Sequence, residues 1–62
     1  MMTNWYEKLK TAMQEAIAKD NQGRALSVAC AAWECMNLRR ITRDQALEIN
    51  GMYDAWEKTW AE

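Results

Sequence analysis

Few residues of this 62-residue chain have types and spacings suited to chemistry. There is no histidine, and the two cysteines are Cys30 and Cys35. Five positions apart on one helix, they lie about 140° apart around its axis and cannot form a disulfide with each other. Metal sites need closer spacing and more ligands. We interpret both as small buried apolar residues, with a redox-linked contact across a dimer axis as the alternative, and expect no metal and no cofactor.

The carboxylates do not suggest catalysis either. Asp20, Asp44 and Asp54 fall mostly on solvent faces of the expected helices. No Ser–His, Cys–His or carboxylate pair in an apolar pocket is visible. A chain of this length could hardly enclose a substrate cavity of several hundred Å³. We expect that the protein is not an enzyme.

Aromatic and basic residues are better candidates for binding, because Trp, Tyr and Arg dominate interface hot spots. For Trp5, Trp33 and Trp56, large core side chains are the simpler interpretation. Trp60 is two residues from the C-terminus of the sequence. Its indole either closes the end of the bundle or contacts a partner.

The arginines Arg39, Arg40 and Arg43 cluster between two expected helices. Solvated caps that complement a helix dipole are the simplest interpretation, and docking to an acidic protein surface is the alternative. A helix-turn-helix reading would present Asp44 and Glu48 to phosphates, which repel them. We therefore do not expect nucleic acid as a partner.

Periodicity and caps predict three helices, over about residues 4–19, 24–38 and 43–60, in a single domain 1–62. Asn4 is a good N-cap, and the run from Thr42 to Gln45 is a capping box. Proline is absent and glycine is rare, which is typical of helical chains. Short connections make neighbouring helices antiparallel. The predicted fold is all-α, a three-helix antiparallel bundle.

The second helix is apolar around most of its circumference, so one of its sides needs a further partner. One apolar face carries Val28, Ala32 and Cys35, and a different one carries Leu26, Cys30 and Trp33. Because so short a chain has a marginal core, we expect a homodimer. The expected partner or dimer interface is Val28, Ala32, Trp33, Cys35, Leu47 and Trp60, with a polar rim of Arg39, Arg40 and Arg43.

Charge and hydropathy restrict the partners and the cellular location that we expect. The net charge is −1, too small for strong nonspecific attraction to nucleic acid or anionic lipid. No run approaches the 18 or so apolar residues of a membrane span. The first eight residues lack the basic and apolar regions of a signal peptide. We expect no membrane association and a cytoplasmic location, with reduced thiols.

Two short runs, Thr3-Asn4-Trp5-Tyr6-Glu7-Lys8-Leu9 and Ile41-Thr42-Arg43-Asp44-Gln45-Ala46, carry a resemblance. With the small size, they resemble the small all-helical accessory proteins encoded in early regions of lambda-like tailed phages. The resemblance implies a protein that binds a host or phage protein and alters it, in the host cell cytoplasm. Some such proteins are dimers, and some inhibit host defence systems.

The function predicted from the sequence is therefore a non-enzymatic protein–protein interaction module, a phage-type modulator of a host or phage protein. One alternative is an anti-CRISPR-like inhibitor of a nucleic-acid-handling host defence complex, with acidic faces that imitate phosphates. The other alternative is a small helical DNA-binding regulator.

Overall fold

Three polar residues mark the starts of three helices in the computed structural model, which describes residues 4–59. Helix α1 spans Trp5–Ala18, α2 spans Gln22–Asn37 and α3 spans Arg43–Glu57. No strand is present among residues 4–59. The prediction of an all-helical chain is confirmed for this part of it.

A side chain caps the N-terminal turn of each helix. Asn4 accepts the backbone N–H of Glu7 at 3.1 Å, and Asn21 accepts an N–H in the same way at the start of α2. At α3, Thr42 accepts from the backbone of Gln45, and the Gln45 side chain accepts from the backbone of Thr42. These bonds satisfy donors that have no partner within the helix.

Helices α1 and α2 end in the same way, with one residue in the left-handed region. Asp20 has φ 53° and Arg39 has φ 60°. The next N–H of the chain then reaches back five residues, from Asn21 to Ala16 and from Arg40 to Cys35, both at 2.8 Å. Because Asp20 makes this turn and Asn21 caps the next helix, Gly23 lies inside α2. Helix α2 therefore begins before the expected residue 24.

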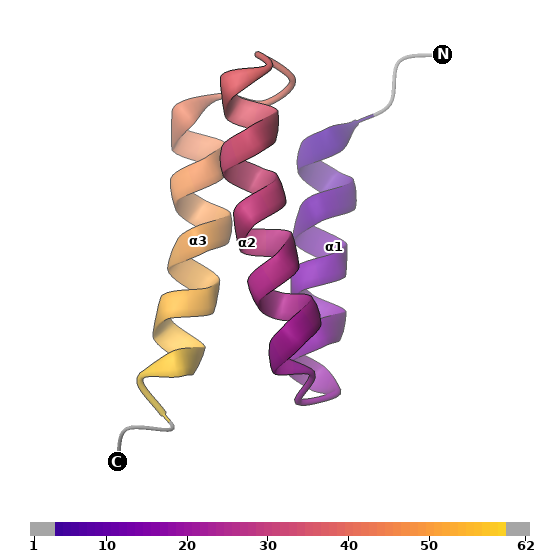
Figure 1. Ribbon diagram of the computed structural model, residues 1–62, viewed down its shortest axis with the longest axis vertical. Coiled ribbons are helices and arrows are strands. Elements are labelled where there is room, and N and C mark those ends of the chain that lie inside the picture. The colour runs from indigo at the N-terminus through magenta and orange to yellow at the C-terminus, as the bar shows by residue number, and fades with distance from the viewer. Residues whose placement is uncertain (1–3, 60–62) are drawn as a thin grey trace.

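The core forms where the three helices meet, and every pair of helices is in contact. In Figure 1, α2 lies between α1 and α3 as seen in that view. Met13 and Ile49 are the largest side chains that are fully buried. Small alanines fill the rest and allow close approach of the backbones. The other buried residues are Leu9, Ala16, Ala25, Val28, Ala29, Ala32, Cys35, Ile41 and Ala46.

The helices of residues 4–59 are too short or too polar to cross a lipid bilayer.

Candidate interaction surface

Helix α2 carries apolar side chains on two sides, and the core covers only one of them. Leu26 is 50% exposed, Trp33 is 37% exposed and Cys30 also lies at the surface. These three residues follow one another at intervals of four and three positions. The same interval defines the seam along which two helices pack in a coiled coil. We call Leu26, Cys30 and Trp33 the α2 stripe.

Helix α3 adds one large apolar side chain, Leu47, which is 47% exposed. The next residue, Glu48, turns toward α1, where it contacts Tyr6 and Lys10. Successive side chains of a helix are about 100° apart, so Leu47 lies on a different side of α3 from Glu48.

Tyr53 of α3 lies near the α2 stripe. Burial raises the pKa of the Tyr53 phenol, and the neighbouring Glu57, Asp54 and, least of all, Cys30 raise it further. Cys30 of α2 is therefore a neighbour of Tyr53 of α3. We call Leu26, Cys30, Trp33 and Leu47, with Tyr53 at the border, the α2–α3 face.

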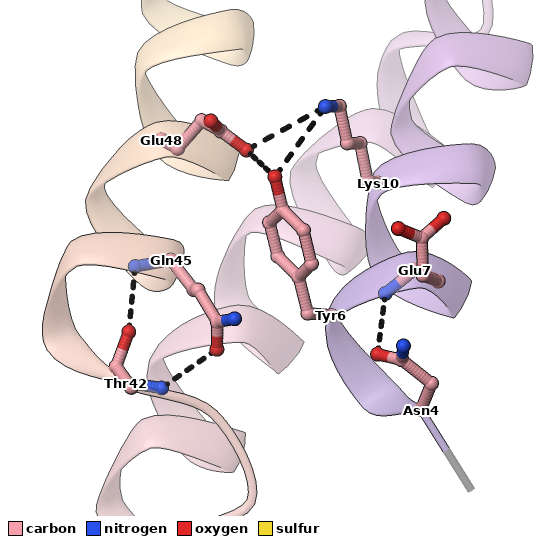
Figure 2. Close-up of polar contacts among 7 residues, drawn as sticks. All are labelled: Asn4, Tyr6, Glu7, Lys10, Thr42, Gln45 and Glu48. Atoms are coloured by element: carbon pink, nitrogen blue, oxygen red, sulfur yellow. Dashed lines mark hydrogen bonds and ion pairs between the residues drawn. The ribbon is translucent and has the colours of Figure 1, made fainter.

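A polar cluster ties α1 to α3 on another side of the bundle (Figure 2). The Tyr6 hydroxyl donates a hydrogen bond to the Glu48 carboxylate. The Lys10 Nζ donates to the Tyr6 oxygen at 3.4 Å and lies 3.8 Å from a Glu48 oxygen. Figure 2 shows the three polar ends pointing toward one another across the gap between the helices.

This cluster changes the acidity of its members in a direction that does not favour catalysis. The pKa of Tyr6 is raised, mainly because its hydroxyl donates to Glu48. The pKa of Lys10 is raised by its hydrogen bond to Tyr6 and then by the charge of Glu48. A nucleophile or base active near neutral pH needs a lowered pKa in these residue types. The cluster is a positioning contact between two helices.

The basic end of the bundle lies at the connection between α2 and α3. Arg39, Arg40 and Arg43 are all exposed there. The Arg40 guanidinium stacks 4.8 Å from the centre of the Trp5 ring, a cation–π contact that joins this connection to the start of α1. Lys10 and Glu48 form the one ion pair found among residues 4–59. The three arginines are therefore not paired with carboxylates in that part of the chain.

A shallow open depression on the surface is lined by Glu7, Lys8, Thr11, Ala12, Glu15 and Arg24. Its charged side chains are of both signs. Within residues 4–59, no group of three or more His, Cys, Asp or Glu side chains is placed to hold a metal ion. Both cysteines are free thiols.

The structure divides the residues predicted for the interface. Val28, Ala32 and Cys35 are 8, 0 and 8% exposed and belong to the core between the helices. They were expected on an open face, but α1 and α3 cover that side of α2. In contrast, Trp33 and Leu47 are exposed. Trp60 lies outside the described residues.

Arg39, Arg40 and Arg43, the residues predicted for a polar rim, are exposed at the connection between α2 and α3. Leu26 and Cys30 were not among the interface residues predicted from the sequence. Their spacing from Trp33 was a usable signal, because it placed all three on one side of α2.

The chain was compared with known protein families, curated proteins and solved structures, and none of them matches it.

Proposed function

We propose that this chain is an antiparallel three-helix bundle that acts as a non-enzymatic protein–protein interaction module. The observation that carries the proposal is the α2–α3 face. Leu26, Trp33 and Leu47 stay 37 to 50% exposed, whereas other apolar residues fill the core. Grouped exposed apolar side chains at a polar rim are typical of interaction sites.

We further propose that the protein is a cytoplasmic homodimer and modulates a host or phage protein. The resemblance to phage accessory proteins supports this setting. The small size supports the dimer, because a core of this kind is marginal on its own. The arginines of the basic end, which have no carboxylate partner among residues 4–59, would contribute the polar rim at which a host or phage protein docks.

Molar mass by light scattering after size exclusion tests the dimer. The chain has a mass of 7.3 kDa, and we expect twice that value across a hundredfold range of concentration. The variant Leu26→Ser should dissociate at higher concentrations than the parent, because it removes an apolar side chain from the α2 stripe.

Leu38→Ser is the matched control. Leu38 is 61% exposed, caps the end of α2 and lies outside the α2–α3 face. It should leave the mass unchanged, and circular dichroism should show that both variants stay helical. A parent protein that is monomeric at every concentration would contradict the homodimer. Equal effects of the two substitutions would contradict the assignment of the face.

A further inference from the structure

The charges that border the α2–α3 face are divided between its two ends. Arg39 lies within the five-residue connection between α2 and α3, and Arg43 is the first residue of α3, followed by Asp44, at one end of the bundle. Asp54 and Glu57 lie in the last turn of α3, at the other end, followed by Lys58 at the cap. On balance, the end at this connection is positive, because three arginines outnumber Asp44 and Glu34, and the other end is negative, because Asp54 and Glu57 outnumber Lys58.

The same division is present within one column of α3. Leu47 follows Arg43 by four positions and precedes Asp54 by seven. These intervals place all three side chains on one side of the helix. Arg43 and Asp54 are eleven residues apart, about 16 Å along the axis at 1.5 Å per residue. Leu47 thus lies between Arg43 and Asp54 on this side of α3, with Lys58 four positions beyond Asp54 on the same side.

We propose that a second copy of this chain packs on the α2–α3 face with its helices running in the opposite direction. The two copies are related by a two-fold axis that runs across the face, between the levels of Cys30 and Trp33. The proposal rests on the homodimer proposed above and specifies its geometry. In this arrangement, α2 packs against α2 of the second copy and α3 against α3. Arg43 of each copy then lies near Asp54 and Glu57 of the other.

Charge complementarity selects this direction over the alternative. If both copies ran in the same direction, the arginines of both basic ends would lie together. Like charges brought together in an interface oppose association. In the reverse direction, both ends of the interface join opposite charges, while the α2 stripe and Leu47 supply the apolar centre. The four-and-three spacing of the stripe suits the packing of one helix along another.

Two charge reversals and their mixture test the direction. Arg43→Glu makes the basic end acidic, and the double variant Asp54→Lys with Glu57→Lys makes the acidic end basic. Both changes also suit the helix dipole, with acid near the start of α3 and base near its end. We therefore expect that the charge reversals do not destabilise α3 through the helix dipole.

We expect each variant alone to self-associate about tenfold more weakly than the parent at low salt, because like charges then face each other at both ends. An equimolar mixture should regain the dimer mass, since unlike chains restore opposite charges at both ends. The effect should shrink as salt is added. Lys19→Glu, on an exposed residue after α1, changes the net charge as much as Arg43→Glu and should change association little.

The outcomes separate this proposal from the one it rests on. A monomeric parent at every concentration would overturn the homodimer itself. A dimeric parent whose Arg43→Glu variant associates more tightly would show that the copies run in the same direction. Dimers that are unaffected by either reversal, or a mixture no more associated than its components, would also overturn the proposed geometry while leaving the homodimer in place.

Discussion

Substitution of Ile49 tests how much of the free energy of unfolding comes from packing at the centre of the bundle. The Ile49 side chain is fully buried, and Ile49→Ala removes three carbon atoms. At about 0.8 kcal/mol for each buried CH₂ group, the lost transfer free energy is about 2.4 kcal/mol. The cavity left behind increases the loss, and the higher helix propensity of alanine offsets about 0.4 kcal/mol. We expect a loss of about 3 kcal/mol in the free energy of unfolding.

A loss of that size is large for this protein. At about 0.05–0.15 kcal/mol per residue, a chain of 62 residues is stable by about 3–9 kcal/mol. Urea titration followed by circular dichroism would measure it, at one fixed protein concentration because the proposed dimerisation would change the apparent stability. Ile49→Val should lose only about 1 kcal/mol. Leu38→Ala, at a residue that is 61% exposed, should change the value by less than about 0.5 kcal/mol.

The ordering of the three variants decides the outcome. Ile49 is not at the centre of a packed core if Ile49→Ala changes the free energy of unfolding by less than about 0.5 kcal/mol. The same follows if it changes that free energy by no more than Leu38→Ala does. The contacts that place α3 against the other helices would then be incorrect. An unchanged urea dependence of the free energy would confirm that the variant loses stability rather than compactness.

Two further predictions concern the surface. Because the pKa of Tyr6 is raised from 10.0 in the folded state, its contribution to stability is present below that pH and is lost as pH rises through the raised value. Tyr6→Phe should therefore flatten the fall of the urea midpoint between about pH 9 and 11, and an unchanged slope would argue against the Glu48 contact. Arg39→Gly should raise the free energy of unfolding by about 1 kcal/mol, because φ is 60° at that residue. The matched Asn37→Gly, at the last residue of α2, should lower it by about 0.3 kcal/mol in the same titration.

The ends of the helices were the most predictable part of the fold, because they depend on neighbours in the sequence. The capping box of Thr42 and Gln45 is a four-residue signal and forms as predicted. The α1–α2 turn was less predictable. Glycine was the expected residue for positive φ, but Asp20 takes that conformation. An aspartate tolerates the left-handed region well enough for Asn21 to become the next cap.

The interaction surface was only partly predictable, for a physical reason. Helix α2 has apolar residues on both sides, and periodicity alone does not say which side the other helices cover. The choice depends on how α1 and α3 pack, which involves contacts between residues far apart in the sequence. Small residues such as Ala25 and Ala32 lie where helices approach closely. The bulky Leu26 and Trp33 remain outside.

The side-chain caps at Asn4, Asn21 and Thr42 have a consequence for how fast the chain folds. Each helix can nucleate from bonds between residues three positions apart, before any other helix is in place. The helices then meet neighbours across connections of three and five residues. Chains dominated by such local contacts fold within about microseconds to milliseconds. With no proline in the sequence, no prolyl isomerisation delays them. Newly made chains would thus spend little time with their apolar residues open to aggregation.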